Sequence, residues 1–171
     1  GSKDFLTSIL PHEIAHLIFR DFVGFKGEVP LWLDEGVAQW SEEVKRDRMK
    51  MLVNELYKDN KLLTINDMMR LNMRILKEKN TVFIRPSRTR AGEEITLVLS
   101  TENLVNTYYI EAVSLINFLV EEYGSDAFAG FCRELRDGKT TEAALRSAYP
   151  DYIHSLNELE DRWKRYLEEQ I

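Results

Sequence analysis

The feature that most constrains this chain is a pair of histidines four residues apart, His12 and His16, with a glutamate directly after the first. On an α-helix, residues four apart lie one turn above each other on the same face, so the two imidazoles can bind one metal ion. Glu13 lies about 100° around the helix from His12, where a carboxylate reaches a water on the metal more easily than the metal itself. Its natural role is that of a general base.

A third ligand is needed, because two imidazoles leave a tetrahedral zinc ion short of one protein ligand. Glu35 follows His16 after eighteen intervening residues and is the best candidate. Glycines and a proline in between predict that the first helix ends near Gly24 and that a second, antiparallel helix begins after Pro30. This arrangement would return Glu35 beside His16, and Gly36, which has no side chain, suits a place where two helices crowd one ion.

The motif at residues 12–16, followed by Glu35, resembles the gluzincin pattern of zinc metallopeptidases. Residues 30–38 are similar to the second-helix motif of peptidase MA-like domains, and the aminopeptidase N-type and thermolysin-like enzymes are more distantly similar. The likeness continues in residues 109–124 and 159–167, so it covers most of the chain.

The resemblance implies a mainly α, zincin-like domain that binds one zinc ion per chain through His12, His16 and Glu35. The zinc would polarise a scissile carbonyl and lower the pKa of its bound water, while Glu13 takes the water proton and delivers it to the leaving amine. The expected function is hydrolysis of peptide bonds in a peptide or protein substrate. Two alternatives stay open: a non-catalytic scaffold or interaction domain, and hydrolysis of a non-peptide amide. The intact Glu13 favours catalysis, since a structural site needs no base.

Two further roles follow from the resemblance. Tyr109 occupies the place where related enzymes carry a tyrosine that stabilises the oxyanion, with Tyr108 as the alternative. Tyr109 is also in helical register with Val113 and Ile116, so a purely structural role is equally open.

Metal-bound histidines normally donate their other ring nitrogen to a carboxylate or a carbonyl. Some relatives carry a carboxylate one turn after the glutamate ligand, where this chain has Gln39. Glu42, Glu43 or a backbone carbonyl are the candidate substitutes.

Composition fits one globular domain over residues 1–171, with 44% hydrophobic residues. The net charge of −6 argues against a nucleic-acid partner, because no basic excess exists to neutralise phosphates. Cys132 is alone, so it forms no disulfide within the chain. No apolar run is long enough for a membrane span.

Gly1-Ser2 resembles a cloning remnant, and gluzincin domains usually carry a β-sheet before the metal helix. We therefore expect a fragment of a longer protein, with other domains of the parent as further partners. The fragment would lack the usual upstream sheet, and any targeting signal would lie upstream, so the compartment is unknown.

Periodicity predicts one β-hairpin among helices. Its strands are 81–84 and 95–100, joined by a long tip that carries Arg85, Arg88 and Arg90. The tip is either solvated or docks an acidic substrate or the upstream region. The predicted helices are 4–20, 31–43, 45–57, 64–76, 107–123, 125–136, 140–148 and 155–169.

Two helix starts are ambiguous in the sequence. Ser8 caps the first helix with Pro11 in its first turn, or the helix starts earlier and kinks at Pro11. Either Thr64 or Asn66 caps the helix predicted at 64–76.

Overall fold

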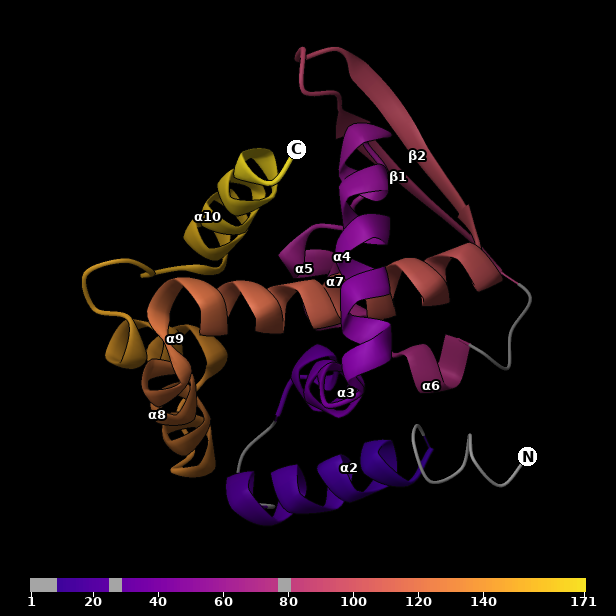
Figure 1. The fold of residues 1–171 in the computed structure, drawn as a ribbon. Coiled ribbons are helices and arrows are strands. Elements are labelled where there is room, and N and C mark those ends of the chain that lie inside the picture. Colours follow the sequence, from indigo (N-terminus) through magenta and orange to yellow (C-terminus); the bar gives the residue numbers. More distant parts are fainter. Residues whose placement is uncertain (1–8, 25–28, 77–80) are drawn as a thin grey trace.

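The structure, a computed structural model, describes residues 9–24, 29–76 and 81–171 (Figure 1). It is mainly α-helical with one two-stranded antiparallel hairpin, which confirms the predicted fold class. In the described part of the chain, every helix is too short or too polar to span a bilayer. The elements are α2 (Leu10–Val23), α3 (Leu31–Trp40), α4 (Glu43–Lys58), α5 (Ile65–Arg70), α6 (Met73–Leu76), β1 (Val82–Arg88), β2 (Glu94–Ser100), α7 (Thr101–Tyr123), α8 (Ser125–Arg136), α9 (Thr141–Ala148) and α10 (Leu156–Glu169).

Helix α7 is the axis on which the other elements pack. Figure 1 shows it crossing the molecule, with α2 and α3 on one side and the hairpin, α5 and α10 on the other. It has 23 residues, starts earlier than the predicted 107, and ends at Gly124 as predicted. The Ser100 hydroxyl caps it by accepting from the backbone N–H of Asn103, so β2 passes directly into the helix. Most residues of its central part are buried in one continuous core.

The helix with the histidine motif ends, and the helix with Glu35 begins, where the sequence predicts. Helix α2 ends at Val23, where Gly24 adopts a φ of 73°, and α3 begins directly after Pro30. Pro11 lies in the first turn of α2, and the question of a Ser8 cap lies outside the described residues. Helix α3 stops at Trp40, before the predicted 43, because Glu42 is extended and starts α4.

The single helix predicted at 64–76 is wrong, since the chain breaks into α5 and α6. Leu71 is extended, with a φ of −76° and a ψ of 129°, and the next residue, Asn72, accepts the backbone N–H of Ile75 with its side chain at 3.4 Å. Thr64, not Asn66, caps α5 through a reciprocal capping box with Asp67. An asparagine that caps a new helix thus ends the old one.

The hairpin has longer strands and a shorter tip than predicted. Its pairing runs from Val82 opposite Ser100 to Arg88 opposite Glu94. Arg85 and Arg88 therefore lie on β1, and only Arg90 belongs to the tip. The Arg85 guanidinium is not solvated as a tip residue would be: it lies 2.8 Å from Asp67 and donates to the Leu62 carbonyl.

Glu111 is a fully buried carboxyl group in the middle of α7. One of its oxygens accepts the backbone N–H of Leu63 at 2.7 Å. Burial raises the pKa of Glu111 well above its ordinary value, although the Leu63 N–H opposes this. The folded state therefore keeps this carboxyl protonated at a pH where the unfolded chain ionises it.

This difference predicts that the Glu111→Gln variant gains stability relative to the parent chain as pH rises. Above the unfolded pKa, the folded parent binds one more proton than the unfolded chain, so its free energy of unfolding falls by up to about 1.4 kcal/mol per pH unit. A glutamine accepts the same N–H and does not titrate. Urea unfolding between pH 5 and 8 measures the difference, with Glu102→Gln on the exposed side of α7 as control. Equal pH slopes for Glu111→Gln and the parent would contradict a neutral carboxyl.

Candidate metal centre

Helices α2 and α3 cross at a steep angle, and this crossing brings the histidines to Glu35. Figure 1 shows α3 nearly end-on while α2 lies across the view, so the predicted antiparallel pair is not formed. Gly36 sets the depth of α3 in the fold. A Cβ there would lie 2.8 Å from the carbonyl oxygen of Ala112 and 3.0 Å from Ile116 Cγ1. Gly36 therefore makes room for helix α7. The prediction that it makes room for a metal ion is not supported.

Three ligand atoms converge at this crossing. The Nε2 atoms of His12 and His16 are 3.2 Å apart, and His16 Nε2 lies 3.7 Å from Oε2 of Glu35. All three ligand atoms lie within 4.8 Å of one another. Zinc ligands at about 2.0–2.1 Å in a tetrahedron are about 3.3–3.4 Å apart, so the histidine pair already has the required spacing. The described residues therefore fit a zinc ion, with a small inward movement between His12 and Glu35.

Asp34 fixes the orientation of His16, a role that the sequence analysis missed. His16 Nδ1 lies 2.8 Å from Oδ1 of Asp34, and the Arg20 guanidinium donates to Oδ2 at 2.8 Å. Burial raises the pKa of Asp34, but the hydrogen bonds from Arg20 and His16 outweigh burial and hold the pKa below its ordinary value. An ionised Asp34 accepts a hydrogen bond from Nδ1–H of His16, which leaves the Nε2 lone pair of His16 for a metal.

Glu42, one of the candidates from the sequence, lies beside the other histidine, His12, without a hydrogen bond. Its Oε1 lies 3.2 Å from His12 Nδ1, at ion-pair distance but not aligned as a hydrogen bond. Glu42 is buried, and Lys45 Nζ donates to its carboxylate at 2.8 Å. The Glu43 side chain lies outside the described residues. Both histidines thus turn Nδ1 toward a carboxylate and Nε2 toward the shared centre.

Two catalytic candidates are not metal ligands: Glu13, the expected general base, and a tyrosine, the expected oxyanion donor. Glu13 lies on α2 directly after His12 and is exposed, whereas His16 is buried. The Tyr108 hydroxyl is buried and donates to the Met68 carbonyl at 3.4 Å, which favours Tyr109 of the two tyrosines. Tyr109 is half-buried with its ring edge-on to Tyr108. Its catalytic role stays a prediction.

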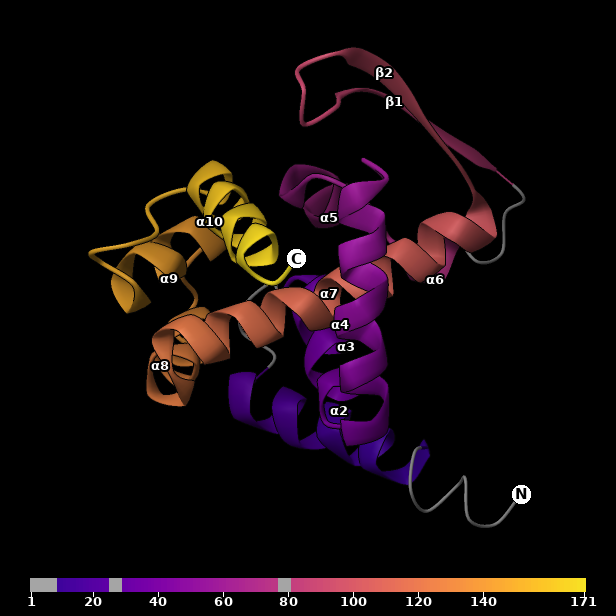
Figure 2. The ribbon, with the colours of Figure 1, turned by 45° about the horizontal axis from the view of Figure 1, so that its top comes forward.

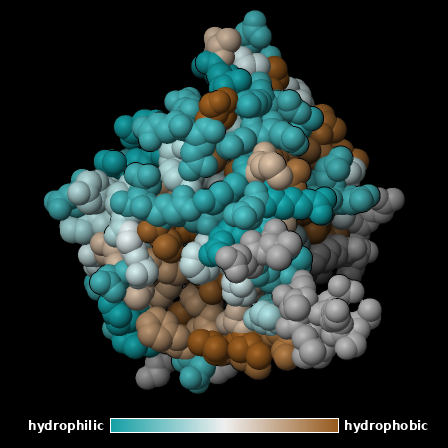
Figure 3. All heavy atoms as spheres, viewed as in Figure 1, coloured by the Kyte–Doolittle hydropathy of each residue, from teal (hydrophilic) through white to brown (hydrophobic). Residues whose placement is uncertain are grey.

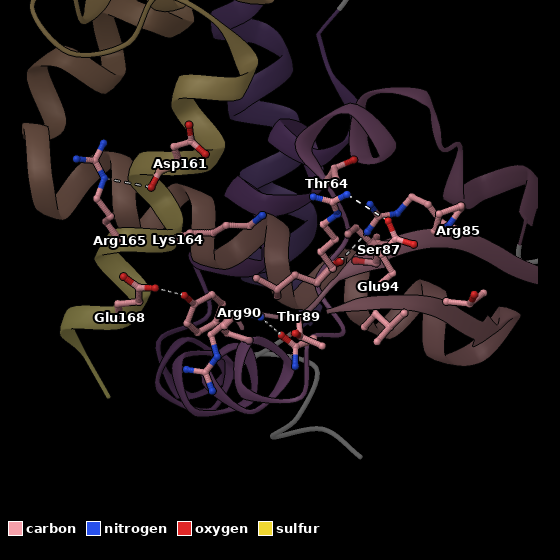
Figure 4. A pocket seen from close by; sticks show the side chains of 18 residues that line it. Thr64, Arg85, Ser87, Thr89, Arg90, Glu94, Asp161, Lys164, Arg165 and Glu168 are labelled. Atoms are coloured by element: carbon pink, nitrogen blue, oxygen red, sulfur yellow. Dashed lines mark hydrogen bonds and ion pairs between the residues drawn. The ribbon is translucent and has the colours of Figure 1, made fainter. Parts of the chain in front are cut away.

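A separate groove of about 1140 Å³ lies on the far side of α7 from α2 and α3. Figure 4 shows its two walls, one formed by α10 with Asp161 and Glu168, the other by the hairpin with Ser87 and Glu94. Arg90 stacks over the Tyr57 ring in this groove at 5.2 Å. None of the candidate metal ligands lines it.

No protein-family model matches the chain, and neither the curated proteins nor the solved structures give a significant match. The resemblance to gluzincins therefore stays a prediction from the sequence.

Proposed function

We propose that this chain is a zinc-dependent peptidase domain with one zinc ion held by His12, His16 and Glu35. The observation that carries the proposal is the convergence of two imidazole nitrogens and one carboxylate oxygen within 4.8 Å. Carboxylates behind both histidines add to it, because partners of this kind are typical of metal-bound imidazoles. Three protein ligands leave the fourth position of a tetrahedral zinc open, as catalytic sites do.

The chain's own residues supply the acid–base chemistry. A bound zinc ion would act as a Lewis acid that lowers the pKa of a water molecule and polarises an amide carbonyl. Glu13, exposed beside His12, accepts the water proton and returns it to the amine that leaves. Asp34 holds the His16 imidazole in the orientation that directs Nε2 to the centre, and the Glu42 carboxylate lies 3.2 Å from Nδ1 of His12. Tyr109 is the candidate donor to the oxygen that becomes negatively charged.

Metal content and cleavage measured on the same preparation test this proposal. We expect about one zinc per chain by elemental analysis, and cleavage of a fluorogenic peptide library that stops with a chelator and returns with zinc. The protein should be purified without nickel resin, which would load the site with another metal. One bound zinc with no cleavage would favour the scaffold alternative. No bound zinc after zinc addition would contradict the site itself.

A further inference from the structure

Arg20 lies on the same face of α2 as the two histidines of the centre, one turn after His16. Its side chain turns toward α3, where Nε and Nη2 both donate to Oδ2 of Asp34, at 3.2 and 2.8 Å. Figure 2 shows α2 and α3 on the side of α7 away from the hairpin. A guanidinium has no lone pair to give a metal, so Arg20 adjoins the centre without being a ligand.

The backbone of α2 fixes the place from which this side chain starts. The carbonyl of Arg20 accepts the N–H of Gly24 at 2.8 Å, in the last turn of the helix. The outer surface of α2 beside it is apolar, since Leu17 is 67% exposed and Ile18 is 64% exposed. Figure 3 shows hydrophobic surface at the lower side of the view, where Figure 1 places α2. Among the described residues, only Asp34 offers Arg20 a carboxylate at ion-pair distance.

Asp34 uses its two oxygens for different partners. Oδ2 accepts from Arg20, and Oδ1 lies 2.8 Å from Nδ1 of His16. Asp34 is buried, and a buried carboxylate needs an opposite charge and hydrogen bonds to be stable. Arg20 supplies both, because a guanidinium is permanently charged and its donors have a fixed geometry. The carboxylate cannot rotate without losing Arg20, so Oδ1 stays directed at His16.

We propose that Arg20 is a positioning residue of the centre, which holds Asp34 so that Oδ1 accepts from Nδ1–H of His16 and Nε2 is available to the metal. The inference rests on the proposed function, because it gives Arg20 a role at that zinc site. An ion pair that only joined α2 to α3 would change stability and not the zinc affinity of the folded chain. A cation beside the site also repels a metal ion, so without positioning the loss of Arg20 would raise the affinity.

The zinc affinity of folded variants tests the proposal, measured by competition with a chromophoric chelator. Arg20→Gln should lower the affinity by about tenfold, the lower end of the range for a lost partner of a metal-bound imidazole. Arg20→Lys should lose less, because it keeps the charge but not the paired donors, and it carries the test if Arg20→Gln does not fold. Arg70→Gln is the control, since it removes an exposed cation from α5, and should keep the parent affinity.

The double variant Arg20→Gln/Asp34→Asn shows whether Arg20 acts through Asp34. Its zinc affinity should equal that of Asp34→Asn alone, because the effects of residues in one chain of contacts do not add. Additive losses would overturn positioning through Asp34. An unchanged or raised affinity in folded Arg20→Gln would overturn the positioning role altogether.

A measurement on the metal-free chain separates this inference from the zinc site itself. Long-range ¹H–¹⁵N correlation spectra report which nitrogen of the neutral His16 ring carries the proton. The Nδ1–H tautomer should dominate in the parent and in Arg70→Gln, and the share of the Nε2–H tautomer should rise in Arg20→Gln. A chain that binds no zinc but shows this change would contradict the proposed function and keep the role of Arg20 in orienting His16. An unchanged tautomer in Arg20→Gln would overturn that role even in a chain that binds zinc.

Discussion

Glu13→Gln is expected to lower peptide cleavage by the zinc-loaded chain by about 10²- to 10⁴-fold, the usual contribution of a positioned general base. Glutamine has nearly the same shape as glutamate but does not accept a proton from water at neutral pH. Because Glu13 is exposed beside His12 and is not one of the three converging ligands, zinc content should not change. The measurement is the initial cleavage rate together with zinc content for the same sample.

Asp21→Asn is the matched control, since it removes one exposed carboxylate from the same helix, two turns after Glu13. It should keep the parent rate. Cleavage that survives Glu13→Gln in a preparation free of other proteases would contradict the proposed mechanism. Loss of both cleavage and zinc in this variant would instead place Glu13 among the ligands.

The sequence predicted the parts of the centre that follow from local geometry. Two histidines four apart meet on any helix, and Gly24 and Pro30 end one helix and start the next for reasons contained in those residues. Glu35 was predicted from its spacing, and the structure brings it to His16. The angle between the two helices was not predictable locally, because it depends on how closely Gly36 lets α3 approach α7.

Asp34 was missed although the signal was present in the sequence. The resemblance to gluzincins indicates a carboxylate one turn beyond Glu35, where this chain has Gln39, whereas the partner of His16 is the residue directly before Glu35. On a helix that crosses α2 steeply, Asp34 and Glu35 can both face His16, one at Nδ1 and the other at Nε2. This conclusion needs the crossing angle. Glu42 was a candidate because only its carboxylate chemistry was required, and its place in the turn before α4 supports it.

The hairpin errors also have a physical cause. Charged residues and a proline between two β-branched runs indicate a loop. Arg85 nevertheless continues β1, because its guanidinium forms an ion pair with Asp67 and donates a hydrogen bond to the Leu62 carbonyl. Pro86 fits the strand because the backbone of residue 86 points away from β2, so no N–H is needed there for the pairing. Tertiary partners of this kind are invisible to local propensity.

His16→Ala is expected to remove tight zinc binding. The loss of zinc affinity should be larger than for a substitution of any residue at the centre that is not itself a ligand. His16 Nε2 is the atom closest to both other ligands, at 3.2 Å from His12 Nε2 and 3.7 Å from Glu35 Oε2. Competition with a chromophoric chelator measures the affinity. Zinc should also raise the melting temperature of the parent, since a ligand that binds only the folded state stabilises it, and should not raise that of the variant.

A graded series makes this prediction specific. Asp34→Asn keeps all three ligands and weakens the support of His16, so zinc affinity should fall by about 10- to 100-fold and by less than in His16→Ala. His154→Ala removes the third histidine of the chain, which is exposed beside Glu158 before α10, and should leave the affinity unchanged. His12→Ala repeats the ligand loss at a less buried position, in case His16→Ala fails to fold. If His154→Ala lost zinc and His12→Ala kept it, the metal would bind at a different place from the crossing of α2 and α3.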